Sequence, residues 1–216
     1  MKFTALLFAS LLAVASAHEV WIEDTPDGQL VVRFAEFGDD YEKSPGHLDA
    51  LDQPRAFAFS PEGKAGVLDV KKLADGFALA GASPKTSAFA EAGFQVMGGG
   101  DKAARRPIFY ARWHVPGAKA AEPALNFDLV PTANAGEARV TFRGKPLPGV
   151  KVTAYLADGS EQELTADAEG LVRVTATKPG LYLIAGKHQR EDQAGFANGK
   201  AYAAVSHNCS LAWRQP

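Results

Sequence analysis

The stretch GKPLPGVKVTAYLADGSEQELTADAEGLVRVTATKPGLYLIAG, residues 144–186, carries the clearest structural pattern in the chain. Short apolar runs alternate in it with proline, glycine and aspartate, the residue types that form turns. Asp158-Gly159 is a typical two-residue hairpin connection. The side chains expected to alternate into one face of a sheet are Val150, Val152, Leu171 and Tyr182. The stretch therefore predicts consecutive short strands and an all-β fold.

The same pattern continues on both sides of this stretch. No segment after residue 17 shows helical periodicity, because glycine and proline interrupt the apolar runs every few residues. We expect further strands over residues 18–23, 29–37, 55–59, 67–70, 77–80, 86–89, 108–115, 137–142 and 201–206. The Pro/Gly/Ala-rich connector 116–123 predicts a boundary. It separates an N-terminal β domain (18–118) from an immunoglobulin-like β-sandwich domain (124–216), on which the first domain is expected to pack.

Charge and motifs exclude several classes of function. The formal net charge is −2 and the basic residues are scattered, so we expect no nucleic-acid surface. Cys209 is the only cysteine, which excludes an internal disulfide. The chain contains no G-x-S-x-G, H-E-x-x-H or phosphate-binding glycine motif. No local spacing supports a pair of glycosidase carboxylates. We therefore expect a protein that is not an enzyme.

Residues 1–17 have the pattern of a secretory signal peptide. Lys2 precedes an apolar run over 3–14, and the sequence A-S-A at 15–17 has small residues at both positions that signal peptidase recognises. The run is shorter than the roughly 20 residues that a membrane-spanning helix needs. We expect a mature protein that is soluble, periplasmic or secreted, and begins at His18.

An N-terminal histidine is a metal chelator. The free α-amine and the imidazole of His18 can bind one ion, since the amine loses its proton near neutral pH. An alternative cleavage after Ala15 leaves Ser16-Ala17-His18. Its amine, two backbone amides and imidazole form the square-planar nitrogen site that suits Cu(II) or Ni(II). We favour cleavage after Ala17, and both alternatives place His18 in a metal site.

Two parts of the chain resemble known families. Residues 144–186 are similar to the carboxypeptidase-regulatory-like, transthyretin-type β-sandwich, with the pattern G-x-P-L-x-G-x-x-V followed by D-G and G-x-Y. HEVWIE (18–23) and LNFDLVP (125–131) resemble segments of a bacterial periplasmic family. Some of its members are additional periplasmic components of nickel or cobalt ECF-type transporters. This resemblance implies a metal-handling periplasmic protein whose partner is an inner-membrane metal transporter.

The histidines are the candidate metal ligands, because imidazole and amine nitrogens suit Ni, Co, Cu and Zn. They are His18, His47, His114, His188 and His207. We expect His18 to anchor the site. His114 lies near the end of the predicted strand 108–115, His188 follows a predicted strand that ends at Ala185, and His47 lies in an acidic loop. One or two of these three are expected to complete the site.

For the remaining candidate residues, a purely structural role is an alternative to metal binding. His207 and Cys209 are two residues apart, so one strand face can present both to a soft metal ion. The alternative for Cys209 is a buried side chain in a terminal strand. Glu19 and Glu23 are expected to be exposed carboxylates. Trp21 and Trp113 are expected to be core or cover residues.

Three hypotheses follow for the function. The first is a periplasmic protein that captures nickel or cobalt and passes it to an inner-membrane transporter. We expect its binding to weaken below about pH 6, and to weaken more on blocking the N-terminus than on changing any one loop histidine. The second is a copper protein with a three-nitrogen histidine brace, either a carrier or an oxidase. The third is a β-sandwich interaction module that binds no metal.

Overall fold

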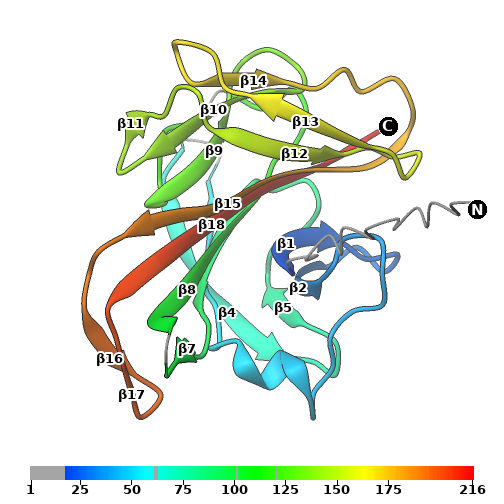
Figure 1. Ribbon diagram of the computed structural model, residues 1–216. Helices are drawn as coiled ribbons and strands as arrows, with labels where there is room; N and C mark the ends of the chain where they lie inside the picture. Colours follow the sequence, from blue (N-terminus) through cyan, green and yellow to red (C-terminus); the bar gives the residue numbers. More distant parts are fainter. Residues whose placement is uncertain (1–17, 61–62, 101, 120) are drawn as a thin grey trace, which may run out of the picture.

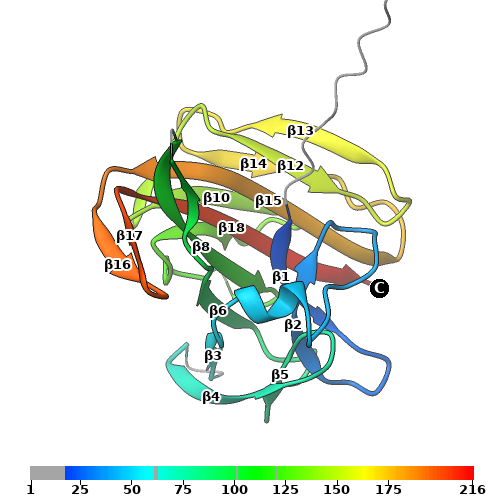
Figure 2. The ribbon, with the colours of Figure 1, turned by 60° about the horizontal axis from the view of Figure 1, so that its bottom comes forward.

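The computed structural model describes residues 18–60, 63–100, 102–119 and 121–216 (Figures 1 and 2). These residues form strands and a short 3-10 helix, η1 (His47–Ala50), which confirms the all-β prediction. No helix among them is both long and apolar enough to cross a membrane. The predicted signal peptide, 1–17, lies outside the described residues and stays a prediction.

Most strands belong to one curled sheet of 12 strands. Those from the N-terminal half are β1 (Glu19–Asp24), β2 (Leu30–Ala35), β3 (Arg55–Phe59), β4 (Ala65–Lys72), β5 (Phe77–Ala80), β6 (Ala88–Gly93), β7 (Met97–Gly99) and β8 (Lys102–Trp113). Those from the C-terminal half are β12 (Lys151–Tyr155), β13 (Glu161–Thr165), β15 (Gly180–Glu191) and β18 (Ala204–Gln215). Their order is β1-β2-β5-β4-β3-β6-β8-β18-β15-β12-β13, with β7 paired to β8.

The two halves of the chain join through a parallel pair in the middle of this sheet. β18 pairs with β8 from Ala204↔Arg105 to Ala212↔Trp113. Both strands are longer than expected, since β8 starts at Lys102 and β18 continues to Gln215. Figure 1 shows the two strands crossing the centre of the molecule side by side. The sheet therefore continues from one predicted domain into the other.

A second, smaller sheet covers the C-terminal half of the first. It consists of β9 (Phe127–Pro131), β10 (Glu137–Phe142), β11 (Lys145–Pro146) and β14 (Leu171–Arg173). Its apolar face packs on β12, β15 and β18. The buried core between the sheets includes Phe127, Leu129, Val140, Val152, Tyr182, Ile184, Leu211 and Trp213. Residues 124–216 thus form two facing sheets, and a separate ribbon of β16 (Gly195–Ala197) and β17 (Lys200–Tyr202) extends from them.

The N-terminal half of the large sheet curls until β1 packs on β8 and β18. The Ser210 hydroxyl of β18 donates to the carbonyl of Val20, 2.7 Å away, and ties β1 to this surface. The enclosed core includes Trp21, Ile22, Leu30, Phe34, Phe77, Phe94, Phe109 and Trp113. Trp21 and Trp113 are therefore core residues, as predicted.

The β1–β2 hairpin forms as its sequence predicts. Val20, Trp21 and Ile22 are residue types that favour strands. The connecting turn ends at Gly28, whose φ of 80° is a conformation that glycine adopts without strain. β1 pairs with β2 from Glu19↔Ala35 to Asp24↔Leu30. This register places the residue before β1 beside the loop that follows β2.

Candidate metal centre

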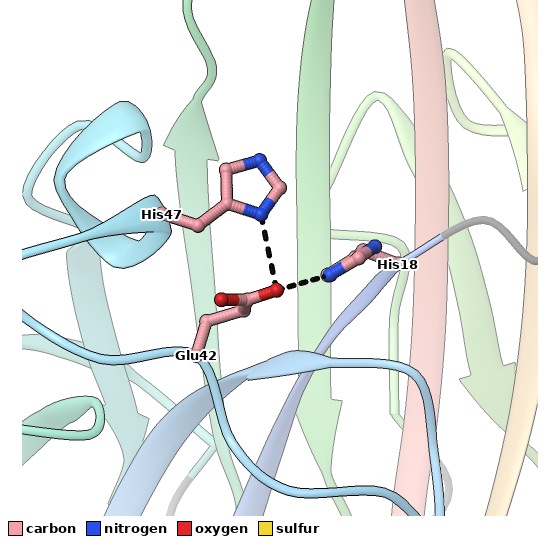
Figure 3. A group of neighbouring side chains, drawn as sticks. All are labelled: His18, Glu42 and His47. Carbon is pink, nitrogen blue, oxygen red and sulfur yellow. Dashed lines mark hydrogen bonds and ion pairs between the residues drawn. The ribbon is translucent and has the colours of Figure 1, made fainter.

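Three side chains with metal-binding atoms meet where β1 begins. The Nε2 atom of His18 lies 2.5 Å from Oε1 of Glu42, and Nδ1 of His47 lies 3.0 Å from the same oxygen (Figure 3). The three ligand atoms all lie within 4.8 Å of one another. Among the described residues this is the only such group of three histidine, cysteine or acidic side chains.

Each side chain comes from a different local structure. His18 directly precedes β1, Glu42 lies in the loop after β2, and His47 is the first residue of η1. The backbone N–H of Glu42 donates to the carbonyl of Phe34 in β2, at 2.9 Å, which turns the loop back toward β1. Leu48 is fully buried and anchors η1 to the core.

The loop between Glu42 and His47 needs a glycine at position 46. The φ of Gly46 is 151°, and a Cβ atom built there would lie 2.8 Å from the carbonyl oxygen of Lys43. Its N–H donates to a carboxylate oxygen of Asp49, 2.9 Å away. This turn brings the start of η1 close to Glu42, so the backbone conformation helps to set the distance between the side chains of Glu42 and His47.

A buried network fixes the residue next to Glu42. The hydroxyl of Tyr41 donates to Oε1 of Glu23 at 2.7 Å, and the guanidinium of Arg33 lies 4.2 Å from the Tyr41 ring centre. Burial and this hydrogen bond to a carboxylate raise the pKa of Tyr41 to about 12. Tyr41 therefore stays protonated as a donor at neutral pH, and it ties the loop to β1.

Aromatic rings form an apolar wall on one side of the three ligands. The ring centres of His18 and Phe34 are 5.0 Å apart, and those of His47 and Phe94 are 5.7 Å apart. Phe34 and Phe94 are buried. His18 and Glu42 are about a quarter exposed, at 28% and 26% of the side chain, and His47 is 44% exposed. An ion from solvent can reach the group, yet water is excluded on its inner side.

The electrostatics of the group favour a cation. The hydrogen bond from His47, and after it the one from His18, lowers the pKa of Glu42. Glu42 is therefore a carboxylate at neutral pH and supplies one negative charge between two imidazoles. Two histidines and one carboxylate form a donor set that zinc, cobalt, nickel and iron sites share. The residues present thus fit a divalent transition-metal ion.

The other three candidate histidines lie apart from this group. His114 follows β8 and lines a separate cavity. His188 lies at an irregularity of β15, where its φ is 61° and its N–H donates to the side chain of Asn208. His207 in β18 is buried, with Nδ1 2.9 Å from the hydroxyl of Tyr110 and Nε2 3.3 Å from Glu191. Only His47, of the predicted partners, joins His18.

Cys209 and the two glutamates of β1, Glu19 and Glu23, are all buried. Cys209 is buried in β18, which agrees with its structural interpretation, and burial raises the pKa of its thiol. The expectation that Glu19 and Glu23 are exposed was wrong, because both faces of β1 are covered. Glu19 accepts from the hydroxyl of Tyr155 at 2.6 Å and pairs with Lys187. Glu23 takes part in the network described above.

Glu42 is the member of this three-residue group that the sequence did not indicate. Its acidic loop was recognised as the surroundings of His47, but four acidic or aromatic neighbours (39–42) carry no signal of which side chain turns inward. Its position five residues before His47 predicts no contact without the Gly46 turn.

Comparisons with protein-family models, with curated proteins and with solved structures found no match to this chain.

Proposed function

We propose that this protein is an exported metal carrier that binds one divalent transition-metal ion through His18, Glu42 and His47. The observation that supports the proposal is the meeting of two imidazole nitrogens on one carboxylate oxygen. We further propose nickel or cobalt as the ion and an inner-membrane uptake system as its recipient. Both ions are bound by imidazole and carboxylate ligands.

The hydrogen bonds of the group occupy the place that the ion would take. Two donors at about 2.1 Å from a tetrahedral ion lie roughly 3.4 Å from each other. The two imidazole–carboxylate distances are 2.5 and 3.0 Å, so a small outward movement of the side chains admits an ion. The exposed side of the group leaves positions for water or for a ligand from a receiving protein. An ion held by three protein ligands can be released more readily than an ion in a closed site, where four protein ligands surround it.

Which ring nitrogen of His18 faces Glu42 decides whether the α-amine of His18 can bind the same ion. An α-amine chelates an ion together with Nδ1 of its own imidazole, whereas Nε2 points away from the amine. In this arrangement Nε2 faces the carboxylate. The proposed site therefore works with or without a free amine, in contrast to the expectation that the N-terminus matters most.

A copper brace is the alternative that the same residues support. The ring centres of His18 and His47 are 5.0 Å apart. If cleavage exposes the amine of His18, a turn of the ring brings the amine, Nδ1 and the imidazole of His47 around one Cu(II) ion. This arrangement does not use Glu42, so the role of Glu42 distinguishes the two sites.

Calorimetric titration of the purified mature protein with Ni²⁺, Co²⁺, Cu²⁺ and Zn²⁺ tests the proposal. We expect 1:1 binding, with nickel or cobalt affinity at least tenfold lower in Glu42→Gln and in His47→Gln. His188→Asn is the matched control, because it removes an imidazole outside the group and asparagine tolerates a positive φ. Full binding by both ligand variants would contradict the site. Tight copper binding that survives Glu42→Gln but not an added N-terminal residue would establish the brace instead.

The carrier role has its own test. Cells with the wild-type gene should take up radioactive nickel or cobalt faster than cells with the Glu42→Gln variant at limiting metal concentration. Equal uptake, with metal binding confirmed in vitro, would contradict delivery to a transporter and leave the binding site intact.

A further inference from the structure

A cavity lies at the end of β8, and none of the residues that line it belongs to the group of His18, Glu42 and His47. Its volume is about 590 Å³, within the range of small-molecule pockets. Its walls are the end of β8, the segment 85–87 and four described residues of the connector after β8, namely Ala118, Lys119, Ala121 and Glu122. Phe59, Trp113 and Val115 supply apolar surface.

Arg112 contributes an unused donor to this cavity. The side chain is almost fully buried, with only 2% exposed, and it lines the cavity wall. Its Nε and Nη2 atoms donate to Asp128 at 3.0 and 2.6 Å, and Nη2 also reaches the carbonyl of Glu122 at 3.3 Å. No described residue accepts a hydrogen bond from Nη1. Among the described residues, the side-chain atoms that are fully buried without a partner are Arg106 Nε and Thr141 Oγ1. Nη1 of Arg112 therefore keeps access to the space of the cavity, where it can donate to an acceptor.

His114 presents a second free polar group to the same space. Its backbone N–H donates to Ala212, but its imidazole has no hydrogen-bond partner among the described residues. Burial, and after it the neighbouring Arg112, lowers the pKa of His114 to about 4. The imidazole is therefore neutral at pH 7, with one N–H donor and one acceptor nitrogen. Arg112 and His114 are two residues apart, so they face the same side of the extended chain.

The charges around the cavity favour an anion. Asp128 neutralises Arg112, and the exposed Lys85 and Lys119 add two positive charges at the rim without an ion-pair partner among the described residues. Glu122 is the only acidic side chain among the described lining residues. A ligand with one negative charge and an apolar body would match both the polar and the apolar wall.

We propose that this cavity binds a small organic carboxylate, with the carboxylate held by Arg112 Nη1 and the His114 imidazole and the apolar body against Phe59 and Trp113. Arginine presents N–H groups in the geometry that carboxylates accept. The site is independent of the metal group, so the failure of one proposal leaves the other standing.

Titration of isotope-labelled full-length mature protein by NMR, with benzoate and with hexanoate as probes, tests the proposal. We expect amide shifts that saturate at Thr86, Ser87, His114 and Val115, and no such shifts at Glu42 or His47. Benzamide is the neutral control for benzoate and should bind at least tenfold more weakly. Ala121→Leu, which fills the cavity from the connector, should abolish the shifts, and His114→Phe should weaken binding at least tenfold. His188→Asn should bind as wild type does.

Three outcomes would overturn the proposal. The first is no saturable shift with either carboxylate at millimolar concentration. The second is equal binding of benzamide, which would show a merely apolar pocket. The third is binding of inorganic phosphate as tight as that of benzoate, which would show an anion site with no preference for a carboxylate. Two-dimensional spectra of each variant establish that it is folded, so a lost signal reports the site.

Discussion

At the scale of single residues, the shared oxygen of Glu42 sets how metal binding depends on pH. The lowered pKa of Glu42 keeps it ionised throughout the neutral range, so the protons that compete with a metal ion are those of the imidazoles. An imidazole ordinarily titrates near 6.5, and the α-amine near 7.7–8.0. The pH profile of the affinity therefore reports which nitrogens bind the ion.

We expect the nickel or cobalt association constant to fall as the pH is lowered, with a limiting slope of its logarithm of about 2 per pH unit, because one proton competes for each of the two imidazoles. His47→Gln should reduce the slope to about 1, since one competing proton is removed. Calorimetry at half-unit steps from pH 5 to 8.5 measures this. An affinity that continues to rise up to about pH 8 would instead indicate that the α-amine is a ligand.

At the scale of elements, the loop after β2 is held in place by Tyr41. Tyr41→Phe keeps the ring under Arg33 and removes only the hydrogen bond to Glu23. We expect about a tenfold loss of metal affinity, as for other residues that orient a ligand, and about 1 kcal/mol less free energy of unfolding. Tyr202→Phe, on the separate β16–β17 ribbon, is the matched control. Lower stability with unchanged metal affinity would mean that Tyr41 serves the fold alone.

Elements formed by neighbouring residues were predictable from the sequence, and contacts between distant residues were not. The β1–β2 hairpin and the strands around Asp158-Gly159 follow from alternation and turn residues, which act over a few positions. The pairing of β8 with β18 joins segments about a hundred residues apart, and no local pattern encodes it. The same limit applies to the candidate site. His18 and His47 were recognisable as residue types, but the inward turn of Glu42 depends on β2 and Gly46.

At the scale of the whole molecule, one sheet connects two hydrophobic cores. Trp21 and Trp113 lie in the core under the N-terminal half of the sheet, and Trp213 lies in the core of the two facing sheets. Nine residues of β8 pair with nine residues of β18, and this paired region lies between the two cores. If one half unfolded alone, the central strand of the other would become an exposed edge with unpaired backbone groups. The free energies of the two halves are therefore coupled through this pair.

We expect the halves to unfold together, although a boundary at 116–123 would permit two separate transitions. Incorporation of 5-fluorotryptophan labels the three tryptophans and changes each ring by a single atom. In a urea titration followed by fluorine NMR, the native signals of Trp21, Trp113 and Trp213 should disappear with the same midpoint. Weakening the junction provides the matched comparison: Ala111→Gly, within β8, should lower all three midpoints equally. A separate midpoint for Trp213 would instead show that the C-terminal sandwich unfolds as an independent domain, and that the β8–β18 pair contributes too little to couple the two cores.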